Sequence, residues 1–239
     1  MGRDPGSRAL MHTYRDYRPP SGEAVVDLVR RNPFAVIASS RSGAAPLATH
    51  TPVVLPPGSP VRESFVGHRL WGHIGRENPH WRLFAEQPEA LLVFSSSHAY
   101  VSPSNYRFEP AAPTLNYAAV HLTGRLRIVQ DEEESLAVVE QTVRALEALR
   151  PAQWSMDRSR GLFRKIIGGV VSFHVEVTSE QAMFKLSQDM PAEVHERVAE
   201  DLESPGCPHA DVAGLMRATG VHAPPTETTD HSDEERHDG

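Results

Sequence analysis

The residues best suited to chemistry lie in one short stretch, residues 70–81, which reads LWGHIGRENPHW. Asn is a strong helix N-cap and Pro fits the first helical position, so Asn78-Pro79 predicts that a strand turns here into a helix of residues 79–85. The corner would hold His73 beside Arg76 and free helix N–H groups, which attract anions. The stretch therefore predicts a ligand histidine beside an anion-binding patch, which suits a flat anionic cofactor; the alternative is a surface histidine at an ordinary corner.

Other histidines are alternative ligands. His50 lies in the segment ATHTP, His98 in a predicted loop and His121 in the middle of a predicted strand. No two histidines have the His-x-x-x-His spacing that a zinc protease uses on a helix. One neutral imidazole is enough to hold haem iron axially. Each histidine is therefore either a haem ligand or a hydrogen-bonded structural residue.

A second group of polar residues surrounds a long predicted loop, residues 96–113. Tyr100 and Ser102 lie in the loop, Asn116 follows it, and Lys185 lies at the end of the last predicted strand. Long loops in compact domains are often functional. These side chains could line a pocket for a small polar substrate or bind a cofactor phosphate. The alternative is that the loop satisfies its own backbone through Ser and Asn side chains.

The charge of the chain is distributed unevenly. Residues 189–239 contain 13 acidic and 3 basic residues, whereas the whole chain of 239 residues has a net charge of −7, so the remainder is mildly basic. The basic residues form no stripe typical of nucleic-acid binding. The single cysteine, Cys207, excludes a disulfide framework and covalent haem attachment. Because no membrane span or signal peptide is evident, we expect a cytoplasmic protein with neither nucleic-acid nor membrane partners.

Hydrophobic periodicity predicts mainly β structure with peripheral helices. The predicted strands are 34–39, 46–55, 65–74, 90–95, 114–129, 170–177 and 182–186. The other predicted helices are 21–31, 131–149, 159–167 and 191–202. Gly124 indicates a bulge within its strand. Because no regular β-α-β alternation is present, the pattern favours a split antiparallel β-barrel in residues 14–203. Residues 1–13 are expected to be an extension, and residues 204–239 a disordered acidic tail.

Five segments, in order, resemble the PaiB-like family of FMN-binding negative transcriptional regulators, and the resemblance covers most of residues 14–200. These segments are ATHTP (48–52), LWGHIGRENPHW (70–81), AYVSPSNY (99–106), PTLNYAAVHLTG (113–124) and FKLSQ (184–188). The resemblance implies a flavin-binding-type split barrel and a homodimer with sites at the subunit interface. Leu115 departs from the Trp that the family commonly has after Pro-Thr, which indicates a change in pocket packing.

Within that family, the chain is most similar to the haem-dependent piperazate synthases. This resemblance implies a haem b enzyme that cyclises L-N5-hydroxyornithine to L-piperazic acid by forming an N–N bond with loss of water. It implies that His73 is the axial iron ligand. Arg76 and His121 are further candidate cofactor-binding residues. Candidate catalytic residues are Tyr100, Ser102, Asn116 and Lys185.

Two other functions are compatible with the same residues. One is an FMN-binding redox or regulatory protein, which would bind the flavin phosphate through Arg and Ser or Thr side chains. The other is a haem-binding or haem-degrading protein on the same barrel, which would need an electron donor. The residues alone do not separate haem from flavin, because one histidine and a few polar groups fit either cofactor.

Overall fold

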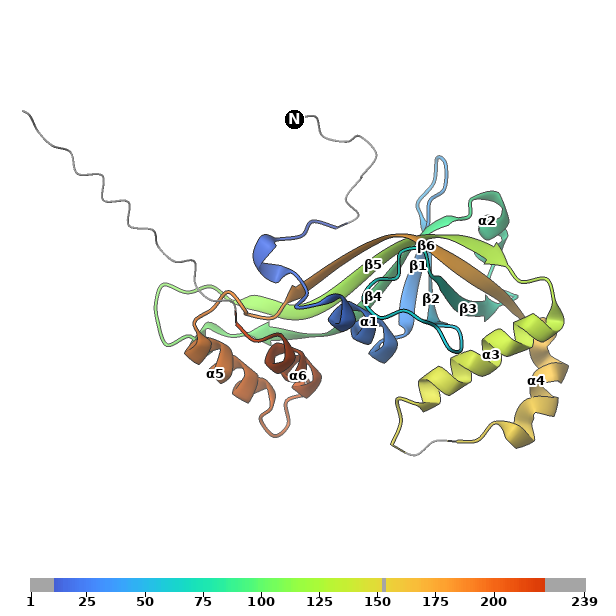
Figure 1. Cartoon of the computed structure of the whole chain (residues 1–239). Helices are drawn as coiled ribbons and strands as arrows, with labels where there is room; N and C mark the ends of the chain where they lie inside the picture. Colours follow the sequence, from blue (N-terminus) through green and yellow to red (C-terminus); the bar gives the residue numbers. More distant parts are fainter. Residues whose placement is uncertain (1–10, 152–153, 222–239) are drawn as a thin grey trace, which may run out of the picture.

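Six antiparallel strands close into a barrel in the order β1-β2-β3-β6-β5-β4 (Figure 1). The computed structural model describes residues 11–151 and 154–221. The strands are β1 (Phe34–Ser39), β2 (Leu47–Val54), β3 (Arg69–Gly75), β4 (Glu89–Val101), β5 (Thr114–Ile128) and β6 (Val170–Lys185). The predicted antiparallel barrel with peripheral helices is confirmed.

Helices lie around the barrel, and the described part of the chain has no regular β-α-β alternation, because only α2 and the pair α3 and α4 separate strands that are successive in the chain. They are α1 (Gly22–Arg31), α2 (Trp81–Glu86), α3 (Glu132–Glu147), α4 (Arg160–Ile166), α5 (Ala192–Leu202) and α6 (Ala210–Thr219). Two predicted caps are confirmed, because the side chain of Ser21 accepts from Ala24 N–H and that of Asp131 from Glu134 N–H. Helix α2 begins two residues later than predicted.

Alternation along β5 separates a buried face from an outer face, apart from Ala119, which is buried on the outer face. Asn116, Ala118, Val120 and Leu122 are buried, whereas Tyr117 and His121 lie on the other face. The register between β5 and β6 shifts at Thr123/Gly124, which confirms the predicted bulge. A Cβ on Gly124 would lie 2.7 Å from the carbonyl oxygen of Glu176, so this close approach of two backbones requires glycine.

Strands β4, β5 and β6 continue beyond the barrel as a three-stranded arm, formed by residues 95–101, 114–119 and 181–185 (Figure 1). The prediction that β4 ends at residue 95 is wrong. Its polar sequence Ser-Ser-Ser-His is unlike a strand, but β4 resumes pairing with β5 after a register shift between Ser95 and His98. The two strands predicted at 170–177 and 182–186 are likewise one continuous strand, β6.

Helices α5 and α6 pack together at the arm, and α6 contacts β4. The disordered tail predicted from residue 204 is therefore wrong for α6, and residues 222–239 lie outside the described part of the chain. Met216 of α6 is fully buried, and its sulfur lies 3.3 Å from the side-chain nitrogen of Asn116. This contact fixes the helix to β5.

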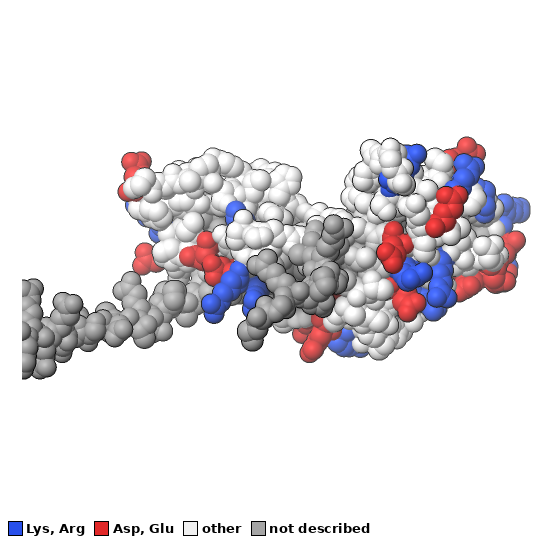
Figure 2. Space-filling view, turned by 90° about the horizontal axis from the view of Figure 1, so that it is seen from above, with Lys and Arg blue, Asp and Glu red and all other residues white. Residues whose placement is uncertain are grey.

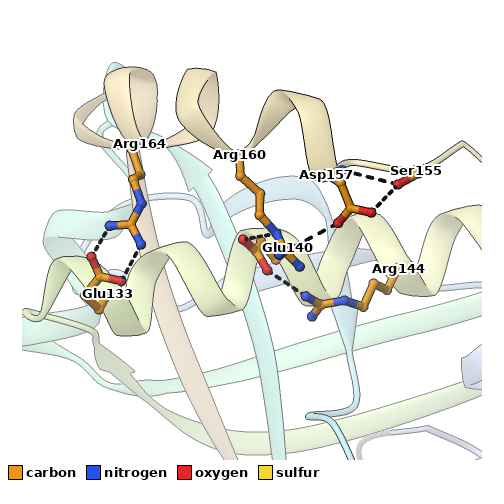
Figure 3. A network of polar contacts seen from close by, with 7 residues as sticks. All are labelled: Glu133, Glu140, Arg144, Ser155, Asp157, Arg160 and Arg164. Carbon is orange, nitrogen blue, oxygen red and sulfur yellow. Dashed lines mark hydrogen bonds and ion pairs between the residues drawn. The ribbon is translucent and has the colours of Figure 1, made fainter.

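Helices α3 and α4 lie at the opposite end of the molecule and are connected by ion pairs (Figure 3). Arg164 pairs with Glu133, and Arg160 contacts both Glu140 and Asp157. Seen from above, acidic and basic side chains mix over this barrel end, and a largely uncharged surface extends from it towards the arm (Figure 2). Among the described residues, none of the helices has both the length and the apolar character that a membrane span requires.

Candidate functional site

The corner after β3 is held by a polar network around Asn78. The side-chain oxygen of Asn78 accepts from His80 N–H at 3.0 Å, and its nitrogen donates to Thr49 Oγ1 at 3.1 Å. Thr49 Oγ1 also lies 2.8 Å from Nδ1 of His80, whose ring is buried against Phe84. The sequence therefore forms a rigid corner, because each polar group of Asn78 fastens a different segment.

His73 projects from β3 just before this corner and is half-buried. Its Nδ1 atom is buried and has no hydrogen-bond partner among the described residues. Burial lowers the pKa of the imidazole below 6.5, so the ring is neutral near pH 7. A neutral imidazole is the form that binds a metal ion. Because Nδ1 is buried, this nitrogen would have to become accessible before iron could reach it.

The backbone of His73 is fixed from both sides. Its carbonyl oxygen accepts a 2.5 Å hydrogen bond from Thr51 Oγ1, and its strand pairs with β6 so that His73 is opposite Ser172. The preceding Gly72 packs so closely that a Cβ there would lie 2.5 Å from Phe173. The imidazole therefore projects from a position that cannot shift freely.

Arg76 fastens the corner to the start of β6. Its Nε donates to the carbonyl oxygen of Gly168 at 2.6 Å, and one terminal nitrogen donates to that of Val170 at 2.9 Å. The predicted patch of free helix N–H groups is wrong at His80, because Asn78 accepts that N–H. Arg76 therefore has a structural role here, whether or not it also contacts a cofactor.

A cavity of about 330 Å³ lies beside the corner. Arg76, Trp81 and Ser172 form part of its wall, and Ser172 is the residue opposite His73. The remaining wall comes mainly from the ends of β5 and α3 and from the segment that precedes β6. The cavity therefore adjoins the corner through Arg76, Trp81 and Ser172, although His73 itself does not line it.

His121 lies on the outer surface of the barrel, in the middle of β5. It is opposite Val93 on β4 and Gln181 on β6, and its Nδ1 is buried without a hydrogen-bond partner among the described residues. Burial lowers its pKa as well. The alternative ligands His50 and His98 are exposed.

The other predicted site residues gather at the arm, where most of them have structural contacts. Asn116 is fully buried and exchanges hydrogen bonds with Ser187 Oγ at 2.9 and 3.1 Å. Ser102 Oγ accepts from Ser104 N–H and so caps a short turn. Tyr100 is 59% exposed. Asn116 and Ser102 therefore serve the fold, and Tyr100 faces solvent.

Lys185 lies among polar and aromatic side chains that come from distant parts of the sequence. Its ammonium group donates to Thr114 Oγ1 and lies 5.6 Å from the centroid of the Tyr17 ring. Tyr17 in turn donates to Asp189 Oδ2 at 3.0 Å. Sequence reasoning missed Tyr17 and Asp189, because 172 positions separate them and only the fold brings them together.

One chain does not bring the two groups of predicted residues together. Ser172, opposite His73, and Lys185 lie on the same strand, so the thirteen steps between them span roughly 40 Å of β6. Figure 1 shows the two ends of β6 at opposite ends of the molecule, near α4 and α5. His73 and Arg76 therefore belong to the barrel end, whereas Tyr100, Ser102, Asn116 and Lys185 belong to the arm.

Residues 11–179 match the model of a protein family described as "Putative FMN-binding domain". The chain is 30% identical over 211 residues to the "Protease synthase and sporulation protein PAI 2" of Bacillus subtilis, and the alignment covers 86% of this chain and 96% of that protein. An uncharacterized protein of Aspergillus fumigatus is 26% identical over 222 residues, with 74% of this chain and 85% of that protein covered.

Among solved structures, a conserved hypothetical protein from Mycobacterium tuberculosis has the same fold. It superposes with a TM-score of 0.53 at 10% identity, covering 76% of this chain and 94% of that chain. At this identity the likeness concerns the fold, and the corner and the arm must be interpreted from their own residues.

Proposed function

The chain belongs to the PaiB-like family of FMN-binding domains, and within it we propose that this protein is a haem-dependent piperazate synthase. It would convert L-N5-hydroxyornithine into L-piperazic acid and water. The observation that carries the proposal is His73: a half-buried, neutral imidazole with an unpartnered nitrogen, on a backbone held by Thr51 and Gly72. The resemblance of the surrounding segment to piperazate synthases supports the choice of cofactor and substrate.

The reaction balances without an oxidant or reductant. A bond forms between the α-nitrogen and N5, the N5–O bond breaks, and the proton lost by the α-amine leaves with the hydroxyl group as water. Haem iron bound at His73 would supply a Lewis acid for the N5 hydroxyl group. The chain's own part is to hold the two nitrogens of a flexible substrate near each other, which is mainly an orientation effect.

Residues of the corner would perform separate parts of this task. His73 would hold the iron, and its lowered pKa keeps the imidazole available as a ligand near pH 7. Arg76 would keep the corner in place through its bonds to Gly168 and Val170. Trp71, two residues before His73 on β3, stacks on His174 of β6 and would help to hold these two strands together.

A homodimer is part of the proposal. Several large apolar side chains are about half exposed or more on β1 and around α3 and α4, and exposed apolar surface of this kind marks protein interfaces. These are Phe34, Leu149, Trp154, Leu162 and Ile166. Within one chain, roughly 40 Å of β6 separates the arm from the His73 corner. A second copy could bring its own arm to that corner.

The test is a conversion assay on the purified protein loaded with haem. Mass spectrometry of L-N5-hydroxyornithine should show a product lighter by one water molecule, formed faster than without protein. The same protein loaded with FMN in place of haem is the matched control. Product formation that does not depend on haem, or no product from fully haem-loaded protein, would contradict the proposal.

An FMN-binding redox protein is the second candidate, and the family's description favours it. In that case the cavity beside Arg76 would take part of the flavin. Titration of FMN with the cofactor-free protein separates the two candidates, since a redox protein of this kind should bind FMN tightly and a haem enzyme should not. Tight FMN binding together with weak haem binding would favour this second candidate.

A further inference from the structure

Five residues at the arm form a polar cluster that the His73 corner does not use. This arm cluster consists of Tyr17, Thr114, Lys185 and Asp189, which are linked by contacts, and of Tyr106, whose pKa is raised by the charge of Asp189. The ammonium group of Lys185 lies on one side of the Tyr17 ring, and the Tyr17 hydroxyl contacts the carboxylate of Asp189. A cation and an anion are thus held near one another around a single phenol ring, and within the described part of the chain they form no ion pair with each other.

Tyr106 supplies an independent indication that a ligand belongs here. Its side chain is 2% exposed, and its hydroxyl group has no hydrogen-bond partner among the described residues. Burial and the negative charge of Asp189 raise its pKa, so the hydroxyl remains protonated and feels the Asp189 carboxylate. A buried hydroxyl without a partner is unfavourable, so a polar ligand atom that reached it through a local opening would stabilise it.

The segment before α1 completes the arm cluster from outside. The backbone N–H of Met11 donates to Gln181 Oε1 at 2.8 Å, and this contact ties the segment to β6 near Lys185. Tyr14 packs edge-on against Tyr17. The cluster is therefore assembled from separate parts of the chain, as binding sites commonly are.

We propose that the arm cluster binds the main-chain end of a free α-amino acid. Asp189 receives the α-ammonium group, and Lys185 receives the α-carboxylate together with the hydroxyl group of Tyr106. A simple anion would be repelled by Asp189 and a simple cation by Lys185, whereas a zwitterion complements both charges. The inference rests on the proposed function and deepens it, because N5-hydroxyornithine carries this end.

The length of β6 between the arm cluster and the His73 corner limits which His73 a bound amino acid can reach. A five-carbon amino acid is far shorter than the roughly 40 Å of strand between Lys185 and the position opposite His73. An amino acid bound at the arm cluster therefore reacts at the His73 of a second copy. Each complete site then takes its iron ligand from one chain and its amino-acid site from the other.

Calorimetric titration of the full-length protein with L-ornithine tests the arm cluster. L-Ornithine has both main-chain groups and lacks the N5 hydroxyl group, so it binds without reacting. Putrescine lacks the carboxylate, and 5-aminopentanoate lacks the α-amine. We expect L-ornithine to bind and both analogues to bind at least tenfold more weakly, because each leaves one charge of the cluster unpaired.

Substitutions in the arm cluster test whether L-ornithine binds there. Lys185→Gln and Asp189→Asn should each weaken L-ornithine binding at least tenfold, and Tyr106→Phe, which removes one oxygen atom, should weaken it severalfold while the protein keeps its melting temperature. Glu193→Gln, on the exposed face of α5, is the matched control and should bind as the unaltered protein does. Haem uptake should be unchanged in all four variants.

The outcomes separate this inference from the proposed function. Unaltered L-ornithine binding in Lys185→Gln and Asp189→Asn, or equal binding of putrescine, would overturn the arm cluster even if the protein forms piperazic acid. A second outcome is a protein that takes up no haem but binds L-ornithine through the arm cluster. This result would support the amino-acid site and contradict the proposed haem enzyme.

Discussion

At the scale of single residues, burial controls the chemistry of the histidines. Among the residues that the structure describes, five histidines have pKa values below 6.5, chiefly because burial disfavours the charged imidazolium. They are His73, His80, His121, His174 and His195. Neutral rings suit metal binding at His73, but they also make the fold sensitive to acid.

We expect the free energy of unfolding to fall as the pH is lowered from 7 to 5. Below pH 6.5 the histidines of the unfolded chain bind protons, whereas the buried histidines of the folded protein stay neutral. Each of them therefore contributes at most about 1.4 kcal/mol per pH unit to the slope of the free energy of unfolding. Urea unfolding at several pH values measures this slope. His121→Gln should make the slope shallower; an unchanged slope would show that His121 titrates normally in the folded protein.

Gly72 and Gly75 lie on either side of His73 in β3, and substitution by alanine should destabilise the protein at Gly72 and have little effect at Gly75. Gly72→Ala places a Cβ 2.5 Å from the fully buried ring of Phe173, which should cost about 1–3 kcal/mol of stability. Gly75→Ala meets nothing within 4 Å and should be nearly neutral. Thermal unfolding of both variants checks this, and equal melting temperatures would mean that the ring of Phe173 moves aside.

The sequence identifies the site residues unevenly. His73 and the Asn78-Pro79 corner are recognisable because the turn preferences of Asn and Pro are local. The predicted N-cap at Asn78 is wrong, since α2 has His80 as its N-cap. The role of Arg76 is not, since its partners Gly168 and Val170 are more than ninety positions away. The pair formed by Tyr17 and Asp189 depends on the whole fold, and no local spacing indicates it.

At the scale of elements, α3 is held by its buried face more than by its charges. Leu136, Val138 and Thr142 are buried against the barrel, whereas the ion pair between Glu133 and Arg164 is exposed. Exposed pairs contribute little because water screens them. The network in Figure 3 therefore orients α4 without supplying most of the stability of α3.

Two substitutions in α3 compare these contributions. Leu136→Ala should lower the free energy of unfolding by about 2–5 kcal/mol, since it leaves a cavity under the helix. Glu133→Gln should leave the urea midpoint nearly unchanged. A larger loss in Glu133→Gln than in Leu136→Ala would mean that the ion pairs hold the helix.

Periodicity identifies most elements and fails where tertiary contacts override it. The alternation of β5 and the bulge at Gly124 are predictable from the sequence, because side chains on a strand alternate faces. The extension of β4 through Ser96 and Ser97 is not, since pairing with β5 stabilises a sequence that resembles a loop. Helix α6 was missed because it lies in a polar region, although Val212, Ala213 and Met216 are buried.

At the scale of the whole molecule, the His73 corner and the arm cluster lie far apart within one chain. The proposed homodimer would bring the two sites together, because the arm of a second copy can reach the corner. Sedimentation equilibrium should give about twice the chain mass of 26.4 kDa. A monomer that still forms piperazic acid would refute the two-chain site.

The most direct measurement is the visible absorption spectrum of the purified protein after expression with added haem. The unaltered protein and His50→Ala, an exposed histidine variant, should both show a Soret band. His73→Ala should lose the band, because the proposed iron ligand is then absent. An unchanged Soret band in His73→Ala, or a flavin spectrum without any Soret band in the unaltered protein, would contradict haem ligation by His73.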